Sequence, residues 1–386
     1  MKDKPELIVF SIYLMGGGAS FHKNLITNRP DDYFDIKCIY LNPLHWVAKR
    51  SDDVVLDENN VVFEFENESN NIVAKRLEKL ISNKEGIIIT NFETELATLA
   101  IYKKSKKTIY FICQDDAYIY LAKKYEHIID VIIAHNIAVY NEICELLPQR
   151  KKDVHFIQHG VEVQKFDRKH NLDKNLRLVF LARHVKLKGI YDLPKIDDEL
   201  LKKGVNVDWL ILGDGEERQN FIEEVKNRNN FNFLIPRTTK DLIKVLKNID
   251  LYILPSSLDG LPVSLLESMS VGCVPVVYNF SEGIKSVITP EIGYVVEKND
   301  IIATAEKIAF LSANRNELVN KSKASYAKVN NEFDIKKQSA LYFNLYKKYK
   351  KYKKNRFFNK HEIVKKINQN RFSNLAYRIV KKIFHS

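Results

Sequence analysis

The sequence predicts an α/β protein with two doubly wound parallel sheets. Short apolar runs alternate with helical patterns, and a polar stretch at 164–175 separates two such series. The length of 386 residues is also sufficient for two hydrophobic cores. We therefore expect one domain over 1–165, a second over 176–332, a closing helix over 333–352 that crosses back to the first domain, and a tail over 353–386.

The first series opens with 7–14 (LIVFSIYL), a near-continuous apolar run that is typical of strands buried on both faces of a parallel sheet. Further strands are expected at 36–41, 86–90, 108–113, 131–134 and 154–158. The spacing of apolar residues predicts helices at 20–28, 72–82, 93–103, 118–125 and 138–146.

The turn after the first strand contains Gly16, Gly17 and Gly18. A glycine loop between a strand and a helix lets the backbone come close to a phosphate or a sugar. The spacing is neither that of a GxGxxG dinucleotide fingerprint nor that of a P-loop. These glycines are candidates for ligand binding, and a plain tight turn is the alternative.

Polar side chains follow two more strands of the first series. Asn91 comes after the strand at 86–90, and Gln114 and Asp115 come after the strand at 108–113. Ligands of doubly wound sheets bind at the carboxyl ends of the strands, so these positions are candidates for a binding site. For Asp115, a role as a helix N-cap remains equally open.

The second series repeats the alternation. Strands are expected at 178–182, 207–212, 231–235, 251–254, 274–277 and 293–296, and helices at 191–203, 216–228, 239–248, 264–271 and 302–314. Arg183 and Lys188 lie just past the first of these strands and ahead of a helix. Two such cations suit a diphosphate, because an arginine grips two oxygens at once and a lysine adds a point charge. A solvated basic loop is the alternative.

Two carboxylates flank the loop after 251–254. Asp259 lies in this loop, and Glu267 follows eight residues later in the expected helix. The backbone N–H groups between them can bind an anion, while the carboxylates can bind sugar or ribose hydroxyls. The residues with these N–H groups are Gly260, Leu261, Pro262, Val263 and Ser264, although Pro262 itself has no N–H. An ordinary strand-to-helix connection with solvated acids is the alternative.

The stretch 254–277 (LPSSLDGLPVSLLESMSVGCVPVV) resembles the acidic signature of the retaining GT-B glycosyltransferases of family 4. That family has two glutamates at the spacing of Asp259 and Glu267, so Asp259 is one methylene shorter than the usual residue. It also has an arginine and a Lys-Gly pair at the spacing of Arg183 and Lys188.

Other positions are similar to the same family. The turn that contains Gly213 and Asp214 is like its Gly-Asp-Gly turn beside the donor site. Asn91 and Gln114 stand where family members often have histidine, while Asp115 matches the family's aspartate. The resemblance covers the second half of the chain, and the first half more loosely.

The resemblance implies a GT-B fold, in which two Rossmann-like domains face each other across a cleft. It also implies a retaining, hexosyltransferase-type enzyme (EC 2.4) that moves a sugar from a nucleoside-diphosphate sugar to a saccharide or lipid-linked acceptor. Arg183, Lys188, Asp259, Glu267 and Asp115 would be the catalytic residues. The donor would contact the three loop glycines, Gly213, Asp214 and 260–264.

No cofactor or metal is expected, because no Asp-x-Asp pair occurs in the chain to hold a divalent ion under a diphosphate. Two other kinds of function remain open. One is a GT-B nucleotide-sugar epimerase or phosphorylase, and the other is a non-catalytic member that binds a donor or a partner. Asp259 in place of glutamate keeps the second alternative open.

The charge of the chain is uneven. The net charge is +12, and 346–386 contain fourteen Lys or Arg and one acid, which leaves −1 for the first 345 residues. A broad nucleic-acid-binding surface on the body is therefore not expected. Apolar residues at helical spacing over 372–384 predict a basic amphipathic helix, which suits an anionic membrane surface. A helix packed on the body and a solvated tail are the alternatives.

The remaining features favour a cytoplasmic protein. The basic tail places it at the inner face of the plasma membrane, and together with the resemblance this implies a role in bacterial surface polysaccharide synthesis. No signal peptide is visible, and no apolar run approaches the ~18 residues that span a bilayer. The four cysteines are scattered without a CxxC pair, so we expect reduced thiols rather than a disulfide framework.

Overall fold

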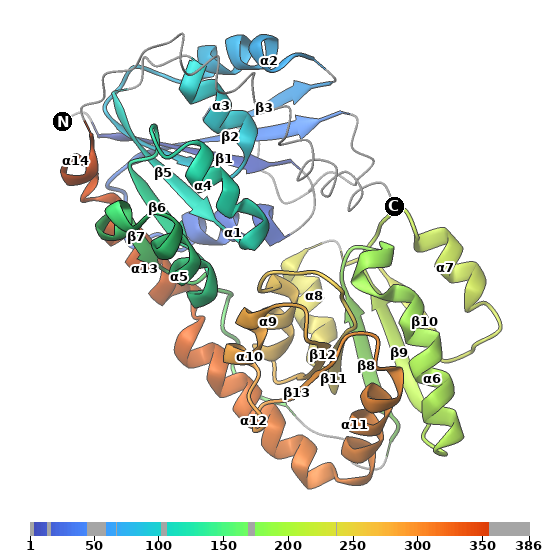
Figure 1. Ribbon diagram of the computed structural model, residues 1–386. Coiled ribbons are helices and arrows are strands. Elements are labelled where there is room, and N and C mark those ends of the chain that lie inside the picture. The colour runs from blue at the N-terminus through green and yellow to red at the C-terminus, as the bar shows by residue number, and fades with distance from the viewer. Residues whose placement is uncertain are drawn as a thin grey trace. The chain divides into compact units, whose positions relative to one another are not determined.

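The computed structural model describes residues 4–13, 17–44, 59–66, 68–101, 106–168, 174–236 and 238–354. The chain divides into two compact units (Figure 1). Unit 1 comprises Met1–His22, Arg29–Gln158 and Ser339–Ser386, and unit 2 comprises Lys23–Asn28 and His159–Gln338. No helix among the described residues is both long enough and apolar enough to cross a membrane.

Unit 1 is built on a seven-stranded sheet with the order β3-β2-β1-β4-β5-β6-β7, and each neighbouring pair is parallel. Its strands are β1 (Glu6–Ile12), β2 (Asp35–Pro43), β3 (Asn60–Phe65), β4 (Gly86–Thr90), β5 (Lys107–Cys113), β6 (Val131–Ala134) and β7 (Val154–Phe156). Its helices are α1 (Gly17–Thr27), α2 (Asn70–Leu77), α3 (Glu93–Ile101), α4 (Ile119–Lys124), α5 (Ile137–Leu146), α13 (Ile335–Tyr346) and α14 (Tyr349–Tyr352), with the 3-10 turns η1 (Glu78–Leu80), η2 (Asp116–Tyr118) and η3 (Pro148–Asp153). The division between the units falls within α1 and within α13.

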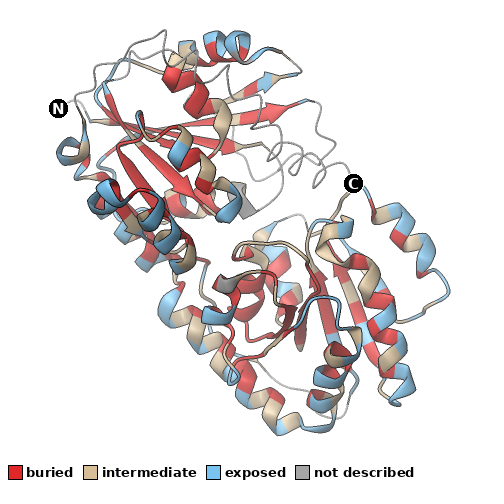
Figure 2. Ribbon diagram, in the orientation of Figure 1, coloured by how far each residue is buried: buried red, intermediate tan, exposed pale blue. Residues whose placement is uncertain are grey.

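Both faces of the first sheet are covered, as its continuous apolar strands require. Alternate residues such as Ile8 and Phe10 belong to one core cluster with α2, α3, α4 and α5. On the opposite face, Tyr110 of β5 packs edge-on against Tyr346 of α13, with ring centroids 5.3 Å apart. The strands are therefore mainly buried (Figure 2).

Unit 2 contains a six-stranded parallel sheet with the order β10-β9-β8-β11-β12-β13. The strands are β8 (Leu176–Leu181), β9 (Val207–Leu212), β10 (Phe231–Leu234), β11 (Leu251–Leu254), β12 (Val274–Tyr278) and β13 (Tyr294–Val296). The helices are α6 (Leu193–Lys202), α7 (Arg218–Glu224), α8 (Thr239–Leu246), α9 (Val263–Met269), α10 (Glu282–Val287), α11 (Ile301–Ala313) and α12 (Arg315–Glu332), with the 3-10 turns η4 (Lys186–Lys188) and η5 (Ile190–Asp192).

The predicted α/β class with two parallel sheets is confirmed. Each predicted strand is present, with ends that shift by a few residues, and β3 is an additional strand. The helices α10 and α12 were not predicted. The four cysteines are free, and Cys38, Cys113 and Cys273 are buried. The amphipathic helix expected over 372–384 lies outside the described residues.

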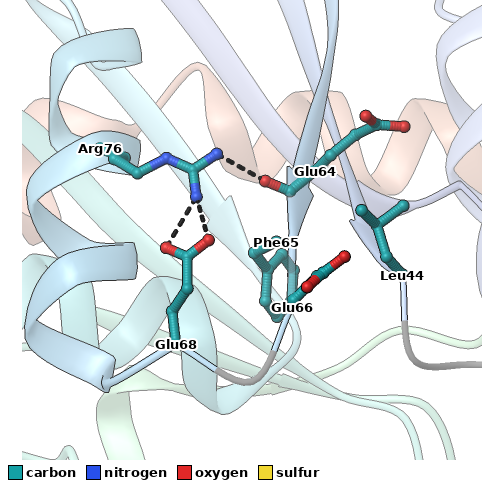
Figure 3. A pocket seen from close by; sticks show the side chains of 6 residues that line it. All are labelled: Leu44, Glu64, Phe65, Glu66, Glu68 and Arg76. Carbon is teal, nitrogen blue, oxygen red and sulfur yellow. Dashed lines mark hydrogen bonds and ion pairs between the residues drawn. The ribbon is translucent and has the colours of Figure 1, made fainter.

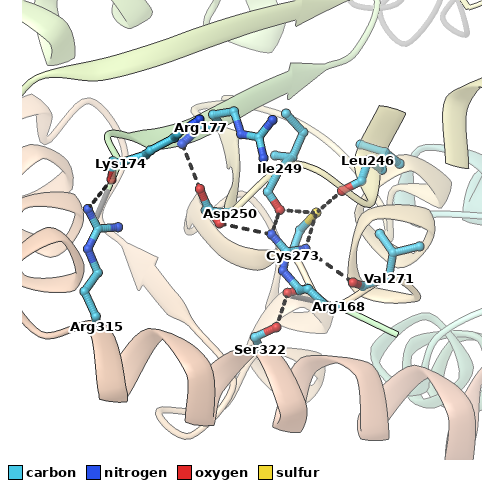
Figure 4. A network of polar contacts seen from close by, with 11 residues as sticks. Arg168, Lys174, Arg177, Leu246, Ile249, Asp250, Val271, Cys273, Arg315 and Ser322 are labelled. Atoms are coloured by element: carbon cyan, nitrogen blue, oxygen red, sulfur yellow. Dashed lines mark hydrogen bonds and ion pairs between the residues drawn. The ribbon is translucent and has the colours of Figure 1, made fainter. Parts of the chain in front are cut away.

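A buried arginine holds the segment that precedes β8 against the amino ends of β11 and β12 (Figure 4). The side chain of Arg168 is 3% exposed. Its guanidinium donates to the backbone carbonyls of Ile249 and Val271 (3.3 Å to the latter) and pairs with Asp250 at 3.2 Å. Asp250 also accepts from the backbone N–H of Arg177 at 2.9 Å.

We expect Arg168→Met to destabilise the protein by about 2–4 kcal/mol, because it leaves two carbonyls and the carboxylate of Asp250 without their buried donor. Urea unfolding measures the change. Arg177→Met is the matched control, since the Arg177 side chain is exposed and only its backbone N–H bonds Asp250. Equal free energies of unfolding for the two variants would contradict the assignment.

Candidate functional site

The strand order of the second sheet places the predicted site residues at its topological switch point. The strands β8 and β11 are neighbours, and the chain continues outward from them in opposite directions. Arg183 and Lys188 follow the carboxyl end of β8, while Asp259 follows that of β11. Ligands of open α/β sheets bind in the crevice at such a point.

Close backbone contacts join the loops that follow β8 and β11. The carbonyl of Leu187 accepts from the backbone N–H of Ser257 at 2.9 Å and from the hydroxyls of Ser256 and Ser257 at 3.2 and 3.1 Å. Gly189 has a φ of 72°, and a Cβ there would lie 1.9 Å from the carbonyl oxygen of Pro255. A glycine is therefore required where the two loops meet.

This contact brings Lys188 to Asp259. The ammonium of Lys188 pairs with the Asp259 carboxylate and lies 3.5 Å from the carbonyl oxygen of Leu258. Both side chains are about one-fifth exposed, at 22% and 21%. Asp259 also accepts from the backbone N–H of Gly260 at 3.2 Å. The predicted phosphate-binding cation and the predicted acid therefore form one partly solvated group.

Glu267 lies on α9 and is 9% exposed. The hydroxyl of Tyr252 in β11 contacts that of Ser264 in the first turn of α9 at 2.9 Å. Burial raises the pKa of Tyr252, and the negative charges of Asp259 and Glu267 raise it further. The two predicted carboxylates thus act on the same buried tyrosine.

The helix after Pro262 is short. Helix α9 begins at Val263, one residue before the predicted start, and has seven residues. Leu261 and Pro262 are buried, and the carbonyl of Gly260 accepts from the Ser281 hydroxyl at 3.3 Å. This loop is therefore packed in place beside Asp259.

The turn after β9 packs on the loop after β8. Gly213 has a φ of 120°, and a Cβ there would lie 2.2 Å from the carbonyl oxygen of Ala182. The carbonyl of Asp214 accepts from the backbone N–H of His184 at 2.9 Å, while its carboxylate accepts from the N–H of Gly215 at 2.9 Å. Arg183, next to His184, is exposed. The structure therefore places Gly213 and Asp214 against the segment that presents Arg183.

Sequence reasoning missed three residues beside this turn. His184 is fully buried, and burial lowers its pKa to about 4, so the ring is neutral at pH 7. The Glu217 carboxylate accepts from the hydroxyl of Tyr191 at 2.5 Å and lies 3.6 Å from the Lys186 ammonium. The hydrogen bond from Tyr191 holds the pKa of Glu217 below its usual value. The Gly-Asp-Gly turn was the only sequence signal near them.

In unit 1, polar groups gather at the switch point between β1 and β4. Asn91 is buried, and its side-chain amide donates to the carbonyl of Phe10 in β1 at 2.8 Å. The amide of Gln114 donates to the Asn91 side chain at 3.4 Å. Both backbone N–H groups of Asn91 and Phe92 donate to Glu95, at 2.9 and 2.8 Å.

The structure also shows the positions of Asp115 and of two of the three loop glycines of unit 1. Asp115 caps the turn η2, and its carboxylate accepts from the backbone N–H of Ala117 at 3.0 Å. Gly17 and Gly18 form the first turn of α1, and Gly16 lies outside the described residues. His22 of α1, which sequence reasoning missed, is buried, and burial lowers its pKa to about 4.

The chain is similar to known glycosyltransferases. Residues 162–328 match the model of the family "Glycosyl transferases group 1". These residues include β8 to β13 and all the site loops of unit 2. Unit 2 contains a group 1 glycosyltransferase domain.

Two curated relatives match part of the chain. The chain is 28% identical over 182 residues to the Capsular polysaccharide biosynthesis glycosyltransferase CapM of Staphylococcus aureus, which is 46% of this chain and 48% of CapM. It is 26% identical over 142 residues to the N,N'-diacetylbacillosaminyl-diphospho-undecaprenol alpha-1,3-N-acetylgalactosaminyltransferase of Campylobacter jejuni, which is 36% of each. The chain thus spans about half of CapM, and about a third of the second relative.

A solved structure has a similar fold over most of the chain. Anabaena HepE, in complex with UDP and glucose, has a TM-score of 0.70 at 15% identity, over 88% of this chain and 99% of HepE. The predicted GT-B fold class is confirmed by this likeness. At this identity, the likeness shows the fold alone.

A hollow of about 400 Å³ lies outside the group 1 domain, in unit 1 beside β3 and α2 (Figure 3). It is lined by Leu44, Glu64, Phe65, Glu66, Glu68 and Arg76. Arg76 binds both carboxylate oxygens of Glu68, at 2.5 and 2.7 Å, and the carbonyl of Glu64 at 2.7 Å. It contains none of the predicted site residues. Among the residues that the structure describes, no group of three or more His, Cys, Asp or Glu is placed to hold a metal ion.

The cluster around Asn91 predicts an unusual pH dependence of stability. Burial raises the pKa of Glu95 from 4.5 to about 7, against the backbone hydrogen bonds that lower it. A raised folded-state pKa contributes stability that is full below about pH 4.5 and is lost as the pH rises through about 7. The free energy of unfolding of Glu95→Gln, relative to that of the wild type, should therefore increase by roughly 2–3 kcal/mol between pH 5 and pH 8.

Urea unfolding at the two pH values measures this difference. Glu145→Gln, which changes an exposed carboxyl on α5, is the control and should follow the wild type. A constant difference between Glu95→Gln and wild type would show that Glu95 ionises normally in the folded state.

Proposed function

We propose that the chain transfers a sugar from a nucleoside-diphosphate sugar to a saccharide or lipid-linked saccharide acceptor. The observation that carries the proposal is the Lys188–Asp259 pair at the switch point of a group 1 glycosyltransferase domain. A cation beside a carboxylate provides for both parts of such a donor, the diphosphate and the sugar hydroxyls. Partial exposure leaves the pair accessible to a ligand.

In this proposal, Arg183 and Lys188 bind the diphosphate and stabilise the charge that develops on it as the glycosidic bond breaks. Asp259 orients Lys188 in the free protein and accepts from sugar hydroxyls in the complex. Glu267 accepts from the ribose hydroxyls. The backbone of Gly213, Asp214 and 260–264 lines the donor, and Gly17 and Gly18 of α1 belong to the proposed donor-binding residues.

The reaction proposed is metal-independent and retains the anomeric configuration. Arg183 and Lys188 supply the positive charge that a divalent ion would otherwise bring to the diphosphate. The acceptor hydroxyl attacks the anomeric carbon from the side on which the diphosphate leaves, and a departing phosphate oxygen takes its proton. Asp115 belongs to the acceptor side.

The biological setting proposed is bacterial surface polysaccharide synthesis at the inner face of the plasma membrane. The names of the two relatives support it, since one is a capsular polysaccharide enzyme and the other is named for a diphospho-undecaprenol acceptor. A hexose donor and a tail that binds the anionic membrane belong to the same proposal.

Donor binding can be tested by thermal shift with UDP-, GDP-, ADP- and dTDP-sugars, each with and without EDTA. A donor at about 100 times its dissociation constant should add roughly 2.7 kcal/mol of stability. We expect one nucleotide to produce this shift, EDTA to leave it unchanged, and Glu267→Gln to abolish it. A shift with none of the donors would rule out the donor site, and a shift that EDTA removes would rule out metal independence.

Turnover separates catalysis from binding. Lys188→Met should lower kcat/KM by about 10²–10³, since it removes a charge that the leaving diphosphate needs. Lys186→Met is the matched control, because that side chain is 63% exposed and pairs with Glu217. Equal losses in the two variants would argue against a specific role of Lys188. A wild-type protein that binds donor without transfer to any acceptor would instead be a donor-binding member of the fold.

A further inference from the structure

An exposed basic surface lies at the amino-terminal edge of the first sheet. We define the basic edge as the exposed lysines Lys106, Lys151, Lys152, Lys348, Lys351 and Lys353. Lys106 precedes β5, Lys151 and Lys152 lie in η3 just before β7, and the other three lie in or beside α14. All six belong to unit 1.

Specific contacts hold α14 at this edge. The ammonium of Lys353 donates to the carbonyl of Lys106, and the backbone N–H of Lys354 donates to Asp130 at 3.2 Å. The ammonium of Lys354 pairs with Asp153. The ring of Tyr352 packs edge-on against His155 of β7, with centroids 5.4 Å apart. The end of the described chain is therefore folded onto the starts of β5, β6 and β7.

Two acids beneath the basic edge, Asp130 and Asp153, are turned inward. Asp130 and Asp153 are 4% and 5% exposed. Asp153 pairs with the buried Arg150 at 2.8 Å and with Lys354, and Asp130 accepts from the backbone N–H of Ile109 at 2.8 Å. Internal donors thus use these two carboxylates. The exposed Glu85, just before β4, pairs with Lys350 of α14 at 3.2 Å, and the six lysines of the basic edge outnumber it.

Large apolar side chains are also exposed on the elements that border this edge. Leu146 ends α5 just before η3 and is 40% exposed, and Phe156 of the edge strand β7 is 39% exposed. Leu341 of α13 is 51% exposed and lies seven residues before Lys348 in the chain. Lysines interspersed with exposed leucine and phenylalanine are typical of surfaces that bind the headgroup region of a membrane. Within the described part of this edge, the arginine is Arg150, and its guanidinium is buried and so not exposed to bases or phosphates.

We infer that the basic edge, together with Leu146, Phe156 and Leu341, docks on an anionic lipid surface. The chain leaves the described structure at Lys354, on this edge, and continues into 355–386 with eight Lys or Arg and one acid. The edge and the tail then bind the same membrane, and two weak anchors give stable attachment where one gives reversible attachment. This inference deepens the membrane part of the proposed function and is independent of the donor chemistry.

The test uses full-length variants and vesicles of phosphatidylcholine with 30% phosphatidylglycerol. The edge variant changes Lys151, Lys152, Lys348 and Lys351 to Glu. The tail variant changes Lys365, Lys366, Lys381 and Lys382 to Glu. The control variant changes four exposed lysines of unit 2 to Glu, namely Lys240, Lys244, Lys298 and Lys323. All three variants have the same change in net charge. Each is checked for folding by thermal denaturation and for donor binding by thermal shift.

We expect the edge variant to lose more than tenfold in vesicle partitioning with its tail intact, since each lysine near an anionic surface contributes about fivefold. The control variant should partition like the wild type, and donor binding should be unchanged in all three. The inference would be overturned if the edge variant bound vesicles as well as the control variant and only the tail variant bound them less. If the edge variant loses vesicle partitioning as expected but the wild-type protein binds no donor, the proposed function would be contradicted and the membrane inference would stand.

A second substitution distinguishes lipid from nucleic acid. Phe156→Ser should weaken partitioning severalfold without a change in charge, because the exposed ring enters the interface. A labelled DNA duplex is the competing probe. Tighter binding of the wild type to the duplex than to vesicles, lost in the edge variant and kept in Phe156→Ser, would assign the edge to nucleic acid instead.

Discussion

The structure depends on the burial of both faces of a parallel sheet. When helices cover both faces of a sheet, groups that must contact water or a ligand lie in the loops at the two ends of the strands. We call these ends the amino-terminal and the carboxyl edge of the sheet. In unit 2, the carboxyl edge holds the group formed by Lys188 and Asp259 at the switch point. In unit 1, the amino-terminal edge has the exposed lysines that surround α14. The proposed donor site therefore lies at a carboxyl edge, whereas the proposed membrane-docking surface lies at an amino-terminal edge.

At the carboxyl edge of unit 2, glycine backbone rather than side-chain packing sets the positions of the charges. Gly189 and Gly213 adopt positive φ values and lie against carbonyls of neighbouring loops, where any Cβ would overlap. These contacts hold three consecutive loops, after β8, β9 and β11, as one layer. A cation on such a layer is preorganised, so that less entropy is lost when a diphosphate binds.

Much of the fold could be predicted from the sequence, because short apolar runs that turn residues bound, such as β1 and β11, are typical of buried strands. Helix α12 was missed because it packs through polar atoms: Ser322 and Ser325 are fully buried and donate to the carbonyls of Gly272 and Cys273, at 2.6 and 2.8 Å. No hydrophobic period marks such a helix. Strand β3 (NVVFEF) was missed because two of its six residues, Asn60 and Glu64, are polar and interrupt the apolar pattern.

Some features of the candidate site could likewise be predicted from the sequence, and others could not. Lys188 and Asp259 could be proposed from local motifs, but their pairing could not, because seventy-one positions separate them and only the sheet order joins their loops. His184 and Glu217 have no motif of their own, and their burial comes from tertiary contacts. Sequence patterns report local geometry, whereas ion pairs between loops follow from topology.

The distribution of charge carries this reasoning one step further. The sequence assigns nearly all the net positive charge to 346–386, yet the first nine of these residues are folded against unit 1. Lysines on a folded surface differ from lysines on a tail, because their backbone is already ordered and binding orders mainly their side chains. They also present their charge in one direction relative to the sheet. A tail alone can only tether a protein to a membrane, whereas a folded basic surface can also fix which face of the unit meets it.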